Sequence, residues 1–258
     1  MNPDFVMRVG VVTPHAAPGP EAEMPDMAPS RVRVTVARIR DAVPGPSGLA
    51  GPTSAEAFRA QLGATALDKA ASGLLPTADV LALASTSSGY ALGRDGEFAV
   101  VKRLNDRWGV PVHAACLSAV AALRSRRVER ICLVHPPWFG ALLNELGAEY
   151  FRSQGFEVVD ARLADVPDDP RLVEPRMVVE WIAAHLGPGA EAVFIGGNGF
   201  RTARAIHLLE RRTGRLVLAA NQVLLWSILE GADAPVSVRG FGTLFDDRRP
   251  GRNNRKER

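Results

Sequence analysis

Residues 191–201 have the sequence EAVFIGGNGFR, in which an apolar run ends at a glycine-rich turn. The run from Ala192 to Ile195 has the length and the branched side chains of a buried strand. The glycines that follow disfavour a longer strand, because glycine loses more backbone entropy than other residues in regular structure. Helical spacing then extends from Arg201 to Arg212. A strand, a glycine loop and a helix N-terminus predict an anion site, although a glycine turn needed only for packing has the same pattern.

Short apolar runs alternate with helix-like segments along the rest of the chain. The expected strands are residues 9–13, 31–39, 80–84, 110–112, 130–134, 157–161, 192–195 and 216–219. The expected helices are residues 54–72, 97–108, 118–126, 141–154, 174–185, 201–212 and 223–230, and residues 15–29 are expected to form a loop. This alternation predicts parallel sheets with helices on both faces.

Three strand-like segments of the first half recur in the same order in the second half. Residues 8–14 resemble residues 130–136, residues 79–85 resemble residues 191–197, and residues 109–116 resemble residues 214–221. One such pair arises easily by chance among buried strands, whereas three pairs in the same order indicate a duplicated unit. We therefore predict an α/β fold of two similar lobes, each a parallel sheet with flanking helices, related by a pseudo-twofold axis with the site between them.

The expected domains are an N-terminal lobe at residues 1–115, a C-terminal lobe at residues 116–245 and a basic, disordered tail at residues 246–258. The net charge of +3 comes from this tail, because residues 248–258 hold five Arg and one Lys against Glu257 and the rest of the chain is weakly negative. The composition, with 47% apolar and 23% charged residues, is that of a globular protein. The body has no basic stripe with interleaved aromatic residues, so we expect no nucleic-acid partner.

The chain has two cysteines, Cys116 and Cys132, and neither belongs to a CxxC motif or to a His/Cys cluster with zinc spacing. We therefore expect no metal site. Residues 1–8 lack the apolar core of a signal peptide, and the apolar stretches elsewhere are too short and too interrupted to cross a bilayer. The expected location is the cytoplasm, with reduced thiols and no membrane partner.

Polar residues follow the predicted strands at the ends where parallel sheets bind ligands. If the two lobes face each other, these strand ends meet: Thr13, Ser85 to Ser87, His113 to Cys116, His135, Gly197 to Gly199, and Asn221 with Gln222. Hydroxyls, amides and backbone N–H groups dominate this set, and carboxylates are scarce. The set therefore favours a small anion as the ligand.

At these residues the sequence resembles the maleate isomerase and arylmalonate decarboxylase branch of the aspartate/glutamate racemase superfamily. The resemblance covers about residues 8–245 and rests on motifs that are weak singly but specific in their order and spacing. These motifs are VGVVTP at 9–14, EAEMP at 21–25, STS at 85–87, RICLVHP at 130–136, IGGNGFR at 195–201 and AANQ at 219–222 with Trp226. The resemblance implies the two-lobed fold, no metal or organic cofactor, and chemistry on small carboxylates.

The catalytic cysteines of the superfamily have no counterparts at the aligned positions. Those positions fall at Ser85 and Gly197, while the isomerase's asparagine falls at Ala17 and its tyrosine at or near Pro137. A serine hydroxyl is a far weaker acid than a thiol, and glycine offers only its N–H group. The alignment therefore disfavours racemisation by two thiols and thiol addition from these positions, and leaves the anion-binding groups.

Four residues are candidates for catalysis. Ser85 is either a donor to the substrate, a nucleophile if a histidine lies close, or a small polar residue that fills the gap left by a lost cysteine. His135, and likewise His113, is a candidate base at a strand end, with a structural histidine bonded to backbone as the alternative. Cys116 is a candidate thiol near the site, with a small buried hydrophobic residue as the alternative.

The expected ligand contacts are hydroxyls, amides and backbone donors at the strand ends, namely Thr13, Thr86, Ser87, Gly197, Asn198, Gly199 and Asn221. Glu21 and Glu23 are either carboxylate bases or solvent-facing and capping residues. Arg201 is either a partner of a substrate carboxylate or a surface residue, and Trp138 is either an apolar wall or part of the core.

Two functions remain open at this point. The first is a cofactor-independent isomerase or decarboxylase-type enzyme that acts on a small carboxylate between the lobes, with Ser85, His135 or Cys116 moving protons. The second is a small-anion-binding pseudoenzyme without catalysis. A titratable side chain that points into the site favours the enzyme. A homo-oligomer is compatible with both functions.

Overall fold

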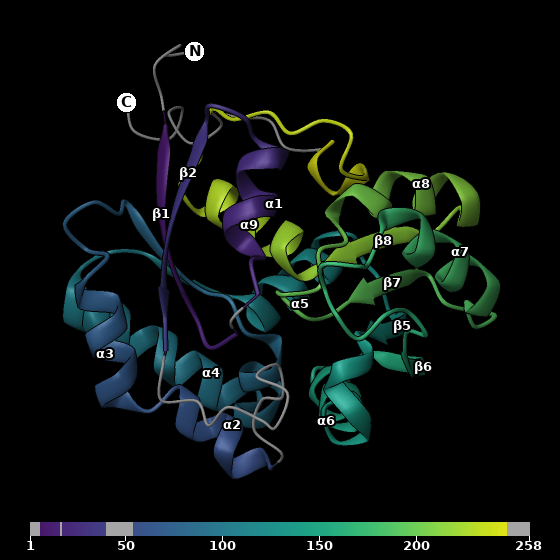
Figure 1. Ribbon diagram of the computed structural model, residues 1–258, viewed down its shortest axis with the longest axis horizontal. Coiled ribbons are helices and arrows are strands. Elements are labelled where there is room, and N and C mark those ends of the chain that lie inside the picture. Colours follow the sequence, from purple (N-terminus) through teal and green to yellow (C-terminus); the bar gives the residue numbers. More distant parts are fainter. Residues whose placement is uncertain (1–5, 16, 40–53, 247–258) are drawn as a thin grey trace.

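The computed structural model describes residues 6–15, 17–39 and 54–246, so residues 247–258 of the predicted tail lie outside the described residues. Two parallel four-stranded sheets form two lobes that lie side by side (Figure 1). The strand order is β2-β1-β3-β4 in the first sheet and β6-β5-β7-β8 in the second. The strands are β1 (Met7–Thr13), β2 (Val32–Arg38), β3 (Val80–Leu83), β4 (Val112–Ala114), β5 (Arg130–His135), β6 (Glu157–Leu163), β7 (Ala192–Ile195) and β8 (Leu216–Ala219).

Equivalent strands occupy equivalent places in the two sheets, as the internal repeats predict. Residues 8–14 and 130–136 contain β1 and β5, which each hold the second place in their sheet. Residues 79–85 and 191–197 contain β3 and β7, which each hold the third place. The predicted α/β fold of two similar lobes is therefore confirmed.

Helices connect the strands in the right order for parallel pairing. They are α1 (Pro20–Met27), α2 (Ala55–Gln61), α3 (Ala64–Ser72), α4 (Thr86–Trp108), α5 (Ala115–Ser125), α6 (Gly140–Ser153), α7 (Pro175–His185), α8 (Ala203–Thr213) and α9 (Ala220–Gly231). Two short 3₁₀ helices cover Pro137–Phe139 and Thr243–Phe245.

Two of the expected segments before β3 are wrong. The expected loop at residues 15–29 contains helix α1, which starts with Pro20 and buries Met24 and Met27. Proline is well suited to the first helical turn, where its missing N–H group needs no partner. The single helix expected at residues 54–72 is divided into α2 and α3, with Gly63 as the N-cap of α3.

Helix α4 begins at Thr86, well before the expected start at residue 97, and is kinked at Gly93, where φ is +68°. The Ser-rich segment at residues 85–88 forms the N-cap and first turn of this helix. Ser85 is the N-cap, because its hydroxyl accepts a hydrogen bond from the Ser88 N–H group at 3.2 Å. Serine disfavours helix interiors but favours this capping position, so tertiary packing and the cap outweigh the low helix propensity of the segment.

Both lobes contribute side chains to one of the apolar core clusters. One cluster of buried side chains contains Val9 and Met24 of the first lobe together with Val193 and Leu225 of the second. Helix α9 packs against both α1 and α5, and these three helices lie between the sheets (Figure 1). Close packing of this kind resists small displacements, so it fixes the strand ends of one lobe relative to those of the other.

Candidate functional site

The start of α4 meets the glycine loop after β7 at the junction of the two lobes. The Gly197 N–H group donates to Thr86 Oγ1 at 2.9 Å, and the Thr86 N–H group donates to Asn198 Oδ1 at 3.1 Å. Gly197 has φ of +91°, a conformation that favours glycine and turns the loop towards α4. The structure thus brings together Thr86, Gly197 and Asn198, three of the expected ligand contacts.

A chain of side-chain hydrogen bonds continues from this point across the junction. Asn198 Nδ2 donates to Asn221 Oδ1 at 2.8 Å, and Asn221 Nδ2 donates to Glu23 Oε2 at 2.7 Å. The Ala203 N–H group at the start of α8 donates to Glu23 Oε1 at 2.7 Å. All three side chains are buried, so these bonds satisfy groups that water does not reach.

Glu23 is part of this chain of hydrogen bonds and does not face solvent. Burial raises its pKa to about 7, while the bonds from Asn221 and from the Ala203 N–H group act in the opposite direction. Glu21, by contrast, pairs with Arg38 and accepts from the Gly19 N–H group at 3.0 Å. The two neighbouring carboxylates therefore have different environments, because they lie on different sides of α1.

The start of α4 and the glycine loop, which the Thr86–Asn198 hydrogen bond joins, also contain backbone N–H groups that are available to a ligand. Within the described residues, the N–H groups of Ser87, Asn198 and Gly199 donate to no protein acceptor. The group at Ser87 lies in the first turn of α4, where the helix dipole also favours negative charge. The junction therefore offers the donors that an anion requires.

Ser85 and Thr13 make local contacts beside this junction. The Ser85 hydroxyl donates to Ser88 Oγ at 2.7 Å and lies 3.2 Å from Ser87 Oγ. The Thr13 hydroxyl donates to the Ala84 carbonyl at 2.8 Å, which ties β1 to the end of β3. Both side chains are buried, and neither contacts a histidine in a hydrogen bond among the described residues.

His135 is fully buried behind the loop, and both of its ring nitrogens have protein partners. Nε2 lies 3.1 Å from Tyr90 Oη, and Nδ1 lies 2.9 Å from Asn144 Oδ1. The Asn144 amide nitrogen donates to the Ala161 carbonyl, so Oδ1 is its free acceptor and Nδ1 of His135 carries the proton. Burial lowers the pKa of His135 to about 4, and the ring is therefore neutral at pH 7.

Cys116 and His113 are likewise engaged with the protein. Cys116 is fully buried, its thiol lies 3.5 Å from the Thr86 carbonyl, and burial together with Glu97 raises its pKa well above the ordinary value. His113 Nδ1 lies 2.8 Å from Ser227 Oγ on α9, and burial lowers its pKa to about 4. These surroundings favour the uncharged form of both side chains.

Sequence reasoning did not consider His15, which follows β1 at the same junction. Its Nδ1 lies 2.9 Å from the Ala17 carbonyl, and its Nε2 is buried with no hydrogen-bond partner. A Cβ atom placed on Gly199 would lie 3.6 Å from His15 Nδ1, so the ring packs against the glycine loop. Its position directly after the strand end Thr13-Pro14 could have indicated a site residue, but His15 was assigned to the expected loop at residues 15–29.

The remaining candidates line the edges of this region. Trp138 packs edge to face on Phe200 with 5.6 Å between the ring centroids, and Arg201 is exposed at the end of the loop. A Cβ atom on Gly19 would lie 2.0 Å from the Asn198 carbonyl oxygen, so the segment before α1 approaches the glycine loop closely.

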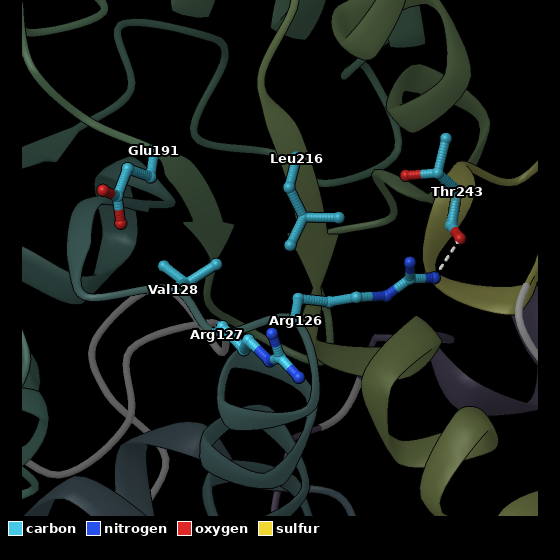
Figure 2. A pocket seen from close by; sticks show the side chains of 6 residues that line it. All are labelled: Arg126, Arg127, Val128, Glu191, Leu216 and Thr243. Carbon is cyan, nitrogen blue, oxygen red and sulfur yellow. Dashed lines mark hydrogen bonds between the residues drawn. The ribbon is translucent and has the colours of Figure 1, made fainter.

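A separate pocket of about 310 Å³ lies at the opposite edge of the second sheet, near the starts of β5, β7 and β8 (Figure 2). Its lining residues are Arg126, Arg127, Val128, Glu191, Leu216 and Thr243. Arg126 donates to the Thr243 carbonyl (Figure 2). None of the predicted site residues lines this pocket.

In the described part of the chain, no helix is long and apolar enough to span a bilayer. The same residues contain no group of three or more His, Cys, Asp or Glu side chains arranged to hold a metal ion.

Known proteins resemble this chain in sequence and in structure. Maleate isomerase from Pseudomonas putida strain KT2440 is 28% identical over 138 residues, which are 52% of this chain and only 54% of the isomerase. The crystal structure of the maleate isomerase Iso from Pseudomonas putida S16 superposes with a TM-score of 0.81 at 23% identity, covering 95% of this chain and 100% of the other. The crystal structure of arylmalonate decarboxylase superposes with a TM-score of 0.76 at 19% identity, covering 93% of this chain and 99% of the other.

The family assignment rests on a match over most of the chain. The family model described as arylmalonate decarboxylase matches residues 53–245, a range that includes α4, the glycine loop and Asn221. This match and the structural similarity confirm the resemblance inferred from the motifs. The chain belongs to the arylmalonate decarboxylase family.

Proposed function

We propose that this protein is a cofactor-independent isomerase or decarboxylase-type enzyme that acts on a small carboxylate at the junction of the lobes. The observation that carries the proposal is the set of free N–H groups at Ser87, Asn198 and Gly199, held in place by the bonds of Thr86 to Gly197 and Asn198. Donors fixed in a site of low water content stabilise negative charge that develops beside a carboxylate. The relatives include maleate isomerase and arylmalonate decarboxylase, which supports chemistry of this class.

The proposed chemistry does not depend on a thiolate. A maleate cis-trans isomerase from Nocardia farcinica, with a TM-score of 0.78 at 21% identity and covering 93% of this chain and 98% of the other, is described with a covalently bound succinylcysteine intermediate. By the motif alignment of the sequence, the cysteine positions of the family are expected at Ser85 and Gly197 of this chain. Cys116 is buried, and its raised pKa disfavours the nucleophilic form of the thiol. Ser85 and Ser87 are therefore proposed as ligand contacts near the α4 N-terminus.

A second candidate function is anion binding without catalysis. It is favoured by one observation, which is that three of the candidates for catalysis are engaged within the protein, through both ring nitrogens of His135, Nδ1 of His113 and the thiol of Cys116. Under this alternative the junction holds a carboxylate but transfers no proton.

Proton NMR in D₂O with malonates, maleate and 2-amino acids tests the proposal. We expect deuterium uptake, isomerisation or loss of CO₂ with at least one compound. Cys116→Ala should keep this activity, whereas Ser87→Ala should lower the affinity for the carboxylate because it removes a nearby hydroxyl. Line broadening of a compound without any reaction would favour the binding protein. Loss of activity in Cys116→Ala, with the fold intact by circular dichroism, would contradict a thiol-independent reaction.

A further inference from the structure

His15 combines three features that no other candidate at the junction combines. Its ring is titratable, its Nε2 atom is buried, and that atom has no hydrogen-bond partner. An unpaired buried nitrogen is costly, because the interaction with water is lost and no protein group replaces it. Such an atom is retained most readily where a ligand completes its hydrogen bonding.

The contacts around the ring place it against the proposed ligand site. The loop before α1 and the glycine loop after β7 enclose it: Cβ atoms added at Gly19 and Gly199 would lie 3.3 Å from His15 Cε1 and 3.6 Å from Nδ1, respectively. Gly199 carries one of the free N–H groups that we propose for the anion. The ring of this half-buried residue therefore lies beside the backbone donors.

The tautomer follows from the bond at the other nitrogen. A carbonyl oxygen only accepts, so Nδ1 donates its proton to the Ala17 carbonyl at 2.9 Å. In the neutral ring Nε2 then carries a lone pair and accepts a proton. The bond to the backbone also fixes the ring orientation, which is what a general base requires.

We infer that His15 is the catalytic proton carrier of the site, with Nε2 as the atom that touches the ligand. This inference rests on the proposed function and adds a residue to it. The C–H bond next to the ligand carboxylate breaks, its electron pair moves into the carboxylate to form an enediolate, and the proton goes to Nε2. The same proton, or a deuteron after exchange with solvent, returns to the carbon and restores the neutral ring.

The charges that face His15 are consistent with this cycle. Burial lowers its pKa to about 4, Glu21 acts to raise it and Arg38 acts to lower it. These two side chains form an ion pair, and Arg38 Nε also donates to the His15 carbonyl at 3.2 Å. The ring is therefore neutral and ready to accept a proton at pH 7. The negative charge of the enediolate then stabilises the imidazolium.

The decisive comparison uses two histidine variants of the full chain. His15→Gln keeps a polar side chain but cannot carry the proton, and we expect deuterium uptake to fall by about 100-fold or more. His185→Gln is the control, since His185 is exposed at the end of α7 and its Nδ1 likewise lies 2.8 Å from a carbonyl, that of Trp181. It should leave the rate of deuterium uptake unchanged. A His15→Gln rate as high as that of the control would overturn the inference.

Imidazole ¹⁵N NMR of the wild-type protein with malonate gives a second measurement that needs no turnover. We expect the His15 Nε2 signal and the Gly199 amide signal to shift together on addition of malonate. Absence of deuterium uptake with this joint shift would overturn the catalytic role of His15 together with the proposed reaction, and would leave only its contact with the ligand. A shift at Gly199 without one at His15, or no shift at either, would overturn the inference. If His15→Gln fails to fold, a wild-type Nε2 signal that malonate leaves unchanged would also overturn it.

Discussion

At the scale of single residues, His135 shapes the backbone around it. A Cβ atom added at Gly196 would lie 2.6 Å from His135 Cδ2 and 2.8 Å from Tyr90 Oη, and one added at Gly147 would lie 2.8 Å from His135 Cε1. The glycines thus leave the space that the ring needs to reach both of its partners. A histidine with both nitrogens bonded and no exposed surface is well suited to hold the end of β5 in place.

Gly196→Ala should destabilise the protein by about 1–3 kcal/mol, because a methyl group at this position overlaps a packed ring whose bonds prevent it from moving away. Gly73→Ala is the matched control. A Cβ atom there would meet only the Ala70 carbonyl at 3.8 Å, and Gly73 already has helical φ and ψ. The control should be neutral or more stable by up to about 1 kcal/mol. Urea unfolding of both variants measures the difference, and equal midpoints would contradict the argument.

The sequence pattern predicted which candidate residues lie close together better than it predicted their surroundings. Strand ends located Thr86, Asn198 and Asn221, which the structure joins by hydrogen bonds. The pattern did not reveal that His135 is completely buried, because burial at a strand end depends on distant residues such as Tyr90. It also did not distinguish Glu23 from Glu21, since the two carboxylates differ only in the partners that folding brings to them.

At the scale of elements, the first turn of α4 connects helix formation with the proposed anion site. Ser85 and the two serines at 87 and 88 form a hydroxyl cluster, and Ser85 Oγ satisfies the Ser88 N–H group. The neighbouring Thr86 N–H group is satisfied by Asn198 from the other lobe. The helix start is therefore fixed partly by its own cap and partly by the second lobe.

Ser85→Ala should lower the free energy of unfolding by about 1 kcal/mol, the usual cost of losing an N-cap side chain. Ser54→Ala removes a comparable cap from α2, where the hydroxyl accepts from the Ala57 N–H group at 3.2 Å, and should cost a similar amount. The two variants should differ in malonate affinity, which only Ser85→Ala should weaken. Calorimetric titration and urea unfolding measure both quantities, and unchanged affinity in Ser85→Ala would separate the cap from the ligand site.

Element boundaries were predictable where periodicity is strong and not where composition is unusual. All eight described strands overlap the predicted segments, although β4 is shifted by two residues to Val112–Ala114. The fully buried strands, such as β3 and β7, are continuous apolar runs, as parallel strands covered on both faces require. Helix α1 was not predictable from periodicity, since it contains Pro25 and acidic residues and owes its position to buried Met24 and Met27. Its first-turn Pro20, Glu21 and Glu23 were the local signals that favour a helix start.

At the scale of the whole molecule, buried titratable groups lie in both lobes and act on stability in opposite directions. Burial raises the pKa values of Glu23 and Glu97 to about 7 and lowers those of His15, His113 and His135 to about 4. Glu97 accepts from Tyr150 Oη at 2.7 Å and from the Cys116 N–H group at 3.2 Å, so it joins α4 to α5 and α6. Each shift is a difference in proton binding between the folded and unfolded chain, and therefore a dependence of stability on pH.

The two carboxyls lose stability as pH rises from their ordinary value of 4.5 to about 7, because the folded state holds protons that the unfolded state has released. The three histidines gain stability as pH rises from about 4 to their ordinary value of 6.5, because the unfolded state holds the protons there. Each fully developed contribution changes the free energy of unfolding by about 1.4 kcal/mol per pH unit. The opposite signs therefore largely cancel, and the contribution of these groups to wild-type stability should vary little between about pH 6 and pH 7.

Removing one of the carboxyls and, separately, one of the histidines should reveal the two opposite pH dependences of stability. Glu97→Gln deletes a falling contribution, so its stability should rise with pH relative to the wild type between about pH 5 and pH 7. His113→Gln deletes a rising contribution, so its stability should fall with pH relative to the wild type between about pH 4 and pH 6.5. Urea unfolding at half-unit steps of pH gives both curves, and each variant is the control for the other because the expected changes in slope have opposite signs. Parallel curves for the two variants and the wild type would show that neither side chain changes its proton affinity on folding.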